Sequence, residues 1–257
     1  VCAVIGCYVV LRGMAFFVFA LAHAILPGVA VAYLLGGNLL LGALVAAFAV
    51  ALLIGFFTKG GALKEDTAIG ILFAAALSLG VALISSIRTY AADLSHILFG
   101  NVLGVSSANL ALTAGIAFLV LLAIVLLFRP FLVISFAPVL AKTLRLPAEG
   151  LRNLMLLLLA LTIVVSLQTV GIGLVAAMLV TPAATAYLLT RRLPTMMLVS
   201  AGLGAASSLV GLYLSYYMNI ASGAAIVLTA TAFFILAFFF APRKGLLWQH
   251  IRREVKA

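Results

Sequence analysis

Long apolar runs separated by short polar breaks extend over almost the whole chain. Residues 39–57 and 110–128 are apolar nearly throughout, and each run has the ~20 residues that a helix needs to cross a ~30 Å hydrocarbon core. The strands of a membrane barrel would instead alternate lipid-facing and lumen-facing residues. Because a helix satisfies its backbone hydrogen bonds within one segment, the pattern predicts an all-α, polytopic bundle of transmembrane helices.

The polar breaks divide these runs into about nine segments, which predicts eight to nine spans. Residues 154–190 are too long for one span and carry Gln168, Gly171 and Gly173 near the middle, so we expect two helices there. Residues 1–11 make about half a span and do not begin with Met, so we expect a truncated first span. The other runs are 14–35, 39–57, 67–87, 109–128, 196–218 and 223–241.

The composition excludes a soluble fold. Hydrophobic residues make up 67% of the chain, with a mean hydropathy of +1.39, against ~45–50% apolar residues in soluble domains. When successive links are placed on alternate sides, all of the 15 basic residues except Arg88 fall on one side. Lys and Arg accumulate in cytoplasmic loops, so we predict a cytoplasmic C-terminus. The positive charge needs no nucleic acid partner, since no run combines basic residues with stacking aromatics.

We expect a transmembrane domain over residues 1–241 and a basic cytoplasmic tail over 242–257. The outer link, 88–108, is longer than a turn requires and is predicted to lie across the outer mouth. It contains Asp93 and His96, which either help to hand a substrate over or cap a short helix.

A second long link, residues 129–153, is predicted to be cytoplasmic. Pro138 and Pro147 bracket eight residues, and proline suits a helix start while the residue before a proline leaves the helix. We therefore expect a two-turn helix that lies parallel to the membrane and contacts a cytoplasmic partner. It comprises Val139, Leu140, Ala141, Lys142, Thr143, Leu144, Arg145 and Leu146.

His23 is the most informative residue within a predicted span. It follows Arg12 by 11 residues, about 16 Å along a helix, which is near the midplane, where ionisable groups usually face a cavity or a partner. Pro27 has no N–H for the carbonyl of His23. The two groups either form part of a cation site or represent a neutral histidine between helices beside a proline kink. None of the five acids falls within a predicted span: Glu65, Asp66, Asp93, Glu149 and Glu254.

Other polar residues in the spans have two interpretations. Gln168, Thr181 and Thr185 either line a pathway at discontinuous helices, or the threonines satisfy backbone groups near Pro182. Small residues four apart in 196–218 predict close helix packing, and Cys2 and Cys7 are read as packing residues. The small-residue rows are Ser200, Gly204, Ser208 and Ser207, Gly211, Ser215.

The chain carries no enzyme signature. It has no phosphate-binding loop with its lysine, no HExxH motif and no GxSxG elbow. We therefore expect a protein that is not an enzyme, and any ATP chemistry must belong to another subunit.

Several runs resemble the permease subunit of the ABC importers for manganese, zinc and iron. They are LRGM at 11–14, ALAHAILPGVA at 20–30, EDTAIGI at 65–71, ILFGN at 97–101, TPAATA at 181–186 and SGAAIVL at 222–228. The resemblance implies a metal-chelate or cobalamin-like permease fold in a bacterial-type plasma (inner) membrane. It also implies a permease homodimer, two cytoplasmic ATPase subunits and an extracytoplasmic metal-binding protein. Residues 139–146 are similar to the helix through which such permeases engage the ATPase.

The sequence departs from the usual pattern of that family just before the run that contains His23. Members usually carry Gly-Asp where this chain has Val18 and Phe19. Residues four apart share a helix face, so Phe19 replaces a carboxylate beside His23. At two further positions where members usually carry an acid, this chain has Ala137 and Asn219. Arg145 lies where members usually carry glycine.

These observations predict a permease that moves a divalent transition metal, manganese, zinc or iron, into the cytoplasm, with no permanently bound cofactor. His23 would contact the metal, and Phe19, Pro27, Gln168, Thr181 and Thr185 are pathway candidates. The alternatives are a permease for a chelated or neutral ligand, an inactive relative of the family, or a secondary transporter or channel. A proton-driven transporter would need intramembrane carboxylates, which the spans lack.

Overall fold

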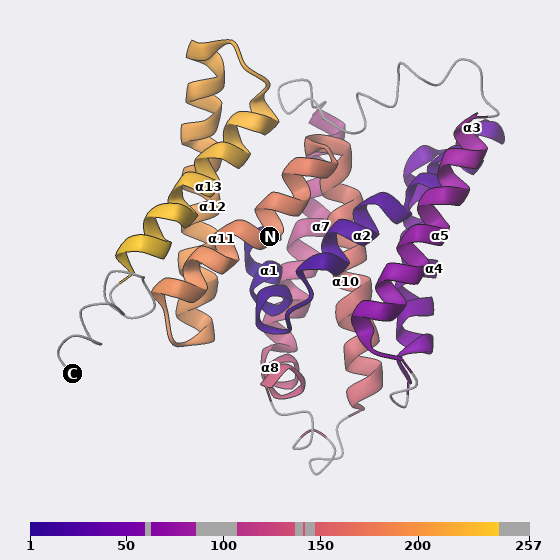
Figure 1. The fold of residues 1–257 in the computed structure, drawn as a ribbon, viewed down its shortest axis with the longest axis horizontal. Coiled ribbons are helices and arrows are strands. Elements are labelled where there is room, and N and C mark those ends of the chain that lie inside the picture. Colours follow the sequence, from indigo (N-terminus) through magenta and orange to yellow (C-terminus); the bar gives the residue numbers. More distant parts are fainter. Residues whose placement is uncertain (60–62, 86–106, 137–140, 142–146, 242–257) are drawn as a thin grey trace. The chain divides into compact units, whose positions relative to one another are not determined.

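The computed structural model describes residues 1–59, 63–85, 107–136, 141 and 147–241. Within these ranges the regular secondary structure is helical and no strand occurs, which confirms the all-α prediction for the described part of the chain. The chain forms two compact units (Figure 1). The terminal unit contains Val1–Gly13 and Gly173–Ala257, and the central unit contains Met14–Ile172.

The terminal unit is built on a long helical hairpin. Helices α12 and α13 pack against each other and are joined by a short turn at Asn219, which has a left-handed φ of 52°. Helix α1 packs on α12. The helices are α1 (Cys2–Leu11), α11 (Ile172–Leu189), α12 (Leu193–Met218) and α13 (Ser222–Phe240).

Small residues on α12 bring its neighbours close. Ser200 Oγ donates a hydrogen bond to the carbonyl of Ala3 on α1 at 2.7 Å, and a Cβ at Gly211 would lie 2.5 Å from the Cα of Ile226 on α13. Cys7 is buried, and both cysteines are free thiols. The rows of small residues therefore have the packing role that the sequence predicts. Those buried on α12 are Ser200, Gly204, Ser207, Gly211 and Ser215.

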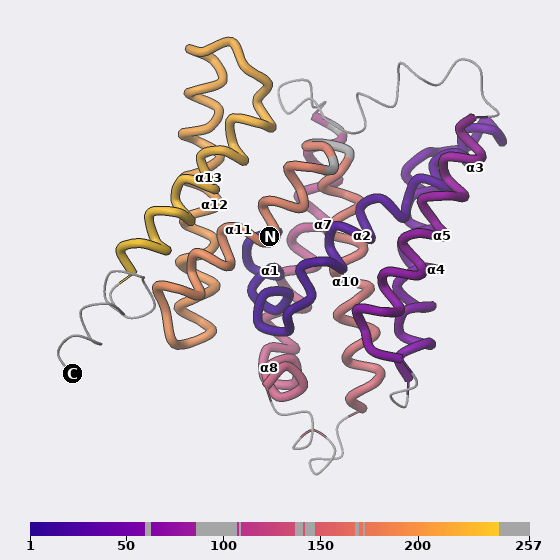
Figure 2. The backbone as a smooth tube through the Cα atoms, viewed as in Figure 1, coloured from indigo at the N-terminus to yellow at the C-terminus, as the bar shows by residue number. Residues whose placement is uncertain are grey.

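The central unit is a bundle in which α10 packs against α2, α4, α7 and α8 (Figure 1). Helices α2 and α3 follow one another along a nearly continuous path (Figure 2) and pack against α4 and α5. The helices are α2 (Ala15–Ala24), α3 (Leu26–Leu34), α4 (Leu39–Phe57), α5 (Glu65–Ser85), α7 (Ser107–Leu126), α8 (Phe128–Phe136) and α10 (Ala148–Val170).

Helix lengths agree with a multi-pass membrane protein. Within the described residues, seven helices are long and apolar enough to cross a bilayer, counting Ala15–Leu34 as one. Two shorter apolar helices, Cys2–Leu11 and Gly173–Leu189, accompany them. The predicted division of 154–190 is confirmed, because α10 ends at Val170 and the next residue, Gly171, has a φ of 84° that glycine adopts without strain.

The predicted link 129–153 is more helical than expected. Helix α8 occupies its first part, and α10 begins at Ala148 rather than near residue 154. Pro130 does not prevent α8, because it lies in the first turn, where the N–H has no intrahelical acceptor. Ala141 is buried.

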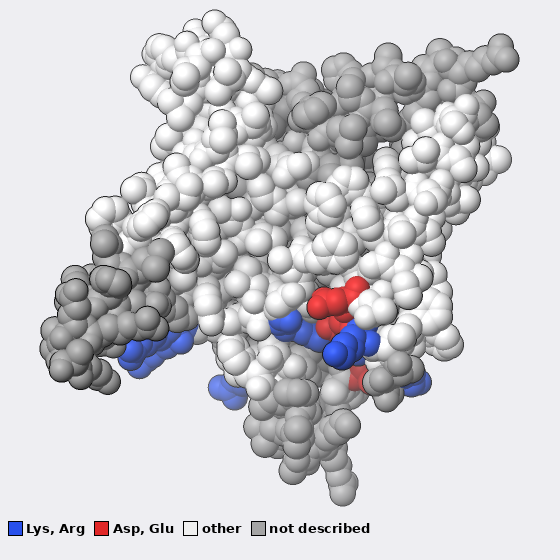
Figure 3. All heavy atoms as spheres, in the orientation of Figure 1, with Lys and Arg blue, Asp and Glu red and all other residues white. Residues whose placement is uncertain are grey.

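The ion-paired side chains that the structure describes in the central unit lie at one end of the bundle. Figure 3 shows acidic side chains directly beside basic ones there, and the described atoms above them on this face are white, the colour of the other residues. The ion pairs join Lys59 to Glu149 and Arg152 to Glu65, each at 3.8 Å. The end of α4 and the starts of α5 and α10 therefore meet, as the alternating placement of links predicts.

Candidate functional site

The candidate site lies where the span Ala15–Leu34 is interrupted. This span has a mean hydropathy of 2.2, yet α2 stops at Ala24 and α3 starts at Leu26 with Pro27 in its first turn. Proline cannot donate to the carbonyl four residues earlier. The backbone N–H of Ile25 contacts the carbonyl of His23 instead. This N–H partly replaces the donor that Pro27 cannot provide.

The ring of His23 is fixed by a hydrogen bond within its own helix. Its Nδ1 lies 2.9 Å from the carbonyl oxygen of Phe19. A carbonyl only accepts, so Nδ1 must carry the proton, and in the neutral ring Nε2 then holds the lone pair. A backbone carbonyl on one ring nitrogen is the usual way to orient the other nitrogen toward a metal.

Aromatic rings surround this imidazole. The Phe19 ring centroid lies 4.4 Å from that of His23, and Phe73 of α5 lies 6.0 Å away in an edge-on arrangement. Phe16 extends the cluster, 6.0 Å from Phe73. We call these four residues the aromatic cluster. Phe19 is 47% exposed and His23 is half-buried, so the cluster is open on one side within the central unit.

The predicted proximity of residues 19 and 23 is confirmed. Within the described ranges, no group of three or more His, Cys, Asp or Glu side chains could hold a metal ion. Among the described residues, His23 thus offers one imidazole nitrogen beside the rings of Phe19 and Phe73, which is a softer environment than a carboxylate site.

The remaining pathway candidates have different surroundings. Pro27 is buried, and its ring lies against Gly80 of α5. Thr185 is buried and donates to the carbonyl of Thr181 at 2.7 Å, which is not the carbonyl of Met178 that Pro182 leaves without its helical donor. Both threonines belong to the terminal unit. Gln168 lies on α10, but its side chain is outside the described part.

Several predicted site residues lie outside the described residues. The outer-mouth pair Asp93 and His96 is among them, and so is the predicted coupling helix apart from the buried Ala141. The others are Val139, Leu140, Lys142, Leu144, Arg145 and Leu146.

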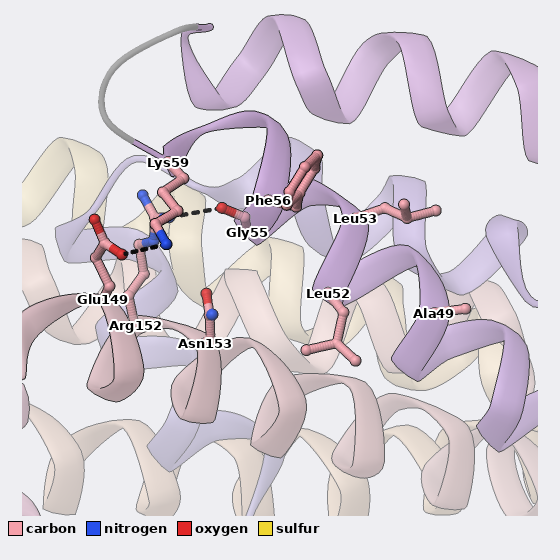
Figure 4. Close-up of a pocket in the computed structure, with 9 residues that line it drawn as sticks. All are labelled: Ala49, Leu52, Leu53, Gly55, Phe56, Lys59, Glu149, Arg152 and Asn153. Carbon is pink, nitrogen blue, oxygen red and sulfur yellow. Dashed lines mark hydrogen bonds and ion pairs between the residues drawn. The ribbon is translucent and has the colours of Figure 1, made fainter.

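A groove of about 610 Å³ opens between α4 and α10 (Figure 4). Leu52, Leu53 and Phe56 line its apolar part, while Lys59 and Arg152 stand at its polar end. It holds one carboxylate, that of Glu149, which pairs with Lys59. One paired carboxylate is too few for a metal site, so the groove offers none among its lining residues.

Sequence reasoning missed two members of the aromatic cluster. Phe16 could have been found, because Phe16, Phe19 and His23 recur at the spacing of one helix face. Phe73 carries no such signal, since its proximity to His23 depends on how α5 packs against α2.

Seven apolar helices of membrane-crossing length among the described residues mark this chain as a multi-pass membrane protein. Residues 1–241 match the family described as the ABC 3 transport family, and the chain belongs to that family.

Relatives agree with this assignment. The chain is 50% identical over 252 residues to a manganese transport system membrane protein, MntC, of Halalkalibacterium halodurans, covering 98% of this chain and 86% of the relative. It is 40% identical over 237 residues to a probable iron transport system membrane protein of Haemophilus influenzae, covering 92% of this chain and 87% of that protein.

Two solved structures have a similar fold. PsaBC from Streptococcus pneumoniae, in complex with Fab, superposes with a TM-score of 0.84 at 40% identity, covering 97% of this chain and 90% of the matched chain. An inward-facing structure described as a metal-chelate type ABC transporter has a TM-score of 0.69 at 19% identity, covering 92% and 82%, and shows the fold alone.

Proposed function

We propose that this chain is the permease of an ABC importer that moves a divalent transition metal, manganese first, into the cytoplasm. The observation that carries the proposal is His23. Its Nδ1 is occupied by the Phe19 carbonyl at 2.9 Å, which leaves Nε2 to contact a cation at the break of a span. The manganese-named relative, identical at half of the aligned positions, supports the choice of metal.

The proposal includes the rest of the importer. Two copies of the permease form the pathway, an extracytoplasmic binding protein delivers the metal, and separate ATPase subunits hydrolyse ATP. The chain has eight to nine spans in a bacterial plasma membrane with a cytoplasmic C-terminus. Family membership supports these partners and replaces the alternative of a secondary transporter or channel.

The direct test is transport by the reconstituted importer. The permease, its ATPase and its binding protein are placed in liposomes, and uptake of Mn²⁺, Zn²⁺ and Fe²⁺ is measured with and without ATP. ATP-dependent Mn²⁺ uptake is expected. If none of the three ions enters at a rate above that of liposomes without the permease, the proposed function is wrong.

A second candidate is a permease for a chelated metal. The observation that favours it is the aromatic cluster, in which Phe19 is 47% exposed and within which no acid lies. Aromatic faces suit an organic chelator better than a bare ion. Uptake of a metal chelate in the same liposomes, without uptake of the free ion, would establish this candidate.

Phe19→Asp is expected to tighten Mn²⁺ binding about tenfold. The substitution places an anionic oxygen beside His23, and a unit negative charge 4 Å from a divalent cation is attracted by about 8 kcal/mol at an effective dielectric constant of ~20. Desolvation of the new carboxylate offsets much of that energy. Carboxylates suit Mn²⁺ more than Zn²⁺, so the gain should be larger for Mn²⁺. Titration calorimetry on the purified permease measures both affinities.

Phe19→Asn is the matched control for this substitution. It has nearly the size of Asp without the charge, so it removes the ring and adds no anionic ligand. Equal Mn²⁺ affinities for Phe19→Asp and Phe19→Asn would exclude residue 19 from the cation site.

Reversing charge in the predicted coupling helix is expected to release the ATPase. Lys142→Glu with Arg145→Glu should reduce co-purification of the ATPase subunit at least fivefold, because both bases lie on the segment predicted to contact it. Arg191→Glu with Arg192→Glu, at an exposed link in the terminal unit, is the control and should retain the ATPase. Equal recovery from both double variants would refute the predicted contact.

A further inference from the structure

Arg152 ties three helix ends together in the central unit. Its Nη2 donates to the carbonyl of Gly55 in the last turn of α4 at 3.0 Å, and its Nη1 lies 3.8 Å from Glu65 Oε1 in the first turn of α5. Arg152 itself lies in the second turn of α10. One guanidinium therefore joins α4, α5 and α10.

The helix ends favour this arrangement. The last carbonyls of a helix lack intrahelical donors and carry partial negative charge, whereas the first turn favours acids. Gly55 provides such a carbonyl, which also accepts from Thr58 Oγ1 at 3.3 Å. Glu65 stands at the start of α5. Arg152 thus contacts the negative C-terminal end of α4 and an acid in the first turn of α5, where an acid is favourable.

Close packing fixes the position of the guanidinium. The side chain of Arg152 is 18% exposed and that of Glu65 is 26% exposed, whereas Lys59 and Glu149 in the neighbouring pair are 65% and 58% exposed. Asn153 lies directly against Gly55, where no Cβ would fit. Figure 4 shows Arg152 and Asn153 of α10 side by side and directed toward Gly55 of α4. Exposed ion pairs contribute little to stability. Of the two ion pairs, that of Arg152 with Glu65 therefore contributes more to holding these helices together.

Helix α5 connects this contact to the aromatic cluster. Glu65 and Phe73 lie eight residues apart on α5, about 12 Å along the axis, and the ring of Phe73 contacts those of His23 and Phe19. Along the chain, Arg152 follows Leu146, the last residue of the predicted coupling helix, by six positions. A displacement of the start of α10 would reach Phe73 through Glu65.

We propose that Arg152 is a positioning residue that makes the starts of α10 and α5 move as one body, so that the ATPase cycle repositions Phe73 against His23. This inference rests on the proposed function, because it assumes an ATPase at the coupling helix and a cation at His23.

The experiment compares Arg152→Gln with Lys59→Gln. Glutamine retains a donor for the Gly55 carbonyl but removes the charge, and Lys59→Gln breaks the exposed pair at the same end of the bundle. In the reconstituted importer, Arg152→Gln is expected to lower the number of Mn²⁺ ions transported per ATP hydrolysed at least fivefold. Lys59→Gln should leave this ratio within twofold of the parent. An unchanged ratio in Arg152→Gln, or an equal fall in both, would overturn the inference.

Exchanging the two charges tests the pair itself. Arg152→Glu combined with Glu65→Arg should recover at least half of the parental ratio, whereas Arg152→Glu alone should not. Size-exclusion chromatography checks that both variants are folded. If they are folded and the ratio does not recover, the Glu65 contact does not transmit the motion.

A labelling measurement separates this inference from the proposed function. Ala76→Cys, three residues beyond Phe73 on α5, is introduced where Cys2 and Cys7 are alanine, and its reaction with a maleimide is followed in the permease–ATPase complex. Trapped ATP should change the rate at least threefold in the parent and in Lys59→Gln, but not in Arg152→Gln. This readout needs no metal, so it holds if the cargo is not manganese. The same response in all three proteins would reject the role of Arg152.

Discussion

Replacing His23 with alanine is expected to reduce ATP-dependent Mn²⁺ uptake at least tenfold in the reconstituted importer. His23 supplies the one imidazole among the described residues of the central unit, and its Nδ1–H bond to the Phe19 carbonyl at 2.9 Å directs Nε2 away from the helix. With no carboxylate at this depth, few ligands remain to replace the water that a cation loses on entering the span. Uptake of radioactive ⁵⁴Mn²⁺ into liposomes measures the loss.

His23→Gln is the matched control for a structural role. Its side-chain amide can donate to the same carbonyl and fill the same half-buried position, but an amide is a poor ligand for a transition metal. We expect His23→Gln to melt within ~2 °C of the parent by differential scanning fluorimetry, because an exposed local hydrogen bond contributes about 1 kcal/mol or less. Its transport should fall as far as that of His23→Ala. Parental uptake by either variant would remove His23 from the cation site.

The helices were largely predictable because lipid imposes one rule over the whole chain. Every backbone group must be satisfied within a helix, so each apolar run of sufficient length reads as a span. The break at Gly171 was also predictable, since a φ of 84° requires glycine at the end of α10. The start of α10 was placed too late, because Ala148 and the polar residues after it belong to the helix yet resemble a loop in composition.

The candidate site was only partly predictable, because its contacts join helices that are distant in sequence. His23 and Phe19 lie one turn apart, and the 3.6-residue period places them together. Phe73 and Arg152 reach their partners through the packing of α2 on α5 and of α10 on α4, which no local pattern specifies. The sequence pattern assigns Arg152 only to the cytoplasmic charges, whereas in the structure it donates to the carbonyl of Gly55, 97 residues earlier in the chain.

The crossing of α3 and α4 depends on two glycines, Gly28 and Gly42. Gly28 and Ala32 lie four apart on α3, and Gly42 and Ala46 lie four apart on α4, which is the spacing of small residues at close membrane-helix contacts. A Cβ at Gly28 would meet the Gly42 carbonyl directly and would lie 2.6 Å from the Cβ of Ala46. The two backbones are thus in contact, and α3 is the continuation of the helix that carries His23.

Gly28→Ala is therefore expected to destabilise the permease by about 2–3 kcal/mol, the upper part of the ~1–3 kcal/mol range for an overpacked interior, and Gly28→Val by more. The added methyl has no flexible neighbour to displace, since backbone and a Cβ oppose it, so α3 and α4 must separate. Gly70→Ala on α5 is the matched control, because no atom lies within 4 Å of its Cβ position and alanine is favoured over glycine in a helix by up to ~1 kcal/mol. Melting temperatures of the detergent-purified proteins should fall for Gly28→Ala and hold or rise for Gly70→Ala. If the two variants have the same melting temperature, the contact between α3 and α4 is looser than the structure indicates. Other contacts would then have to hold α3 in place after the break at Ile25.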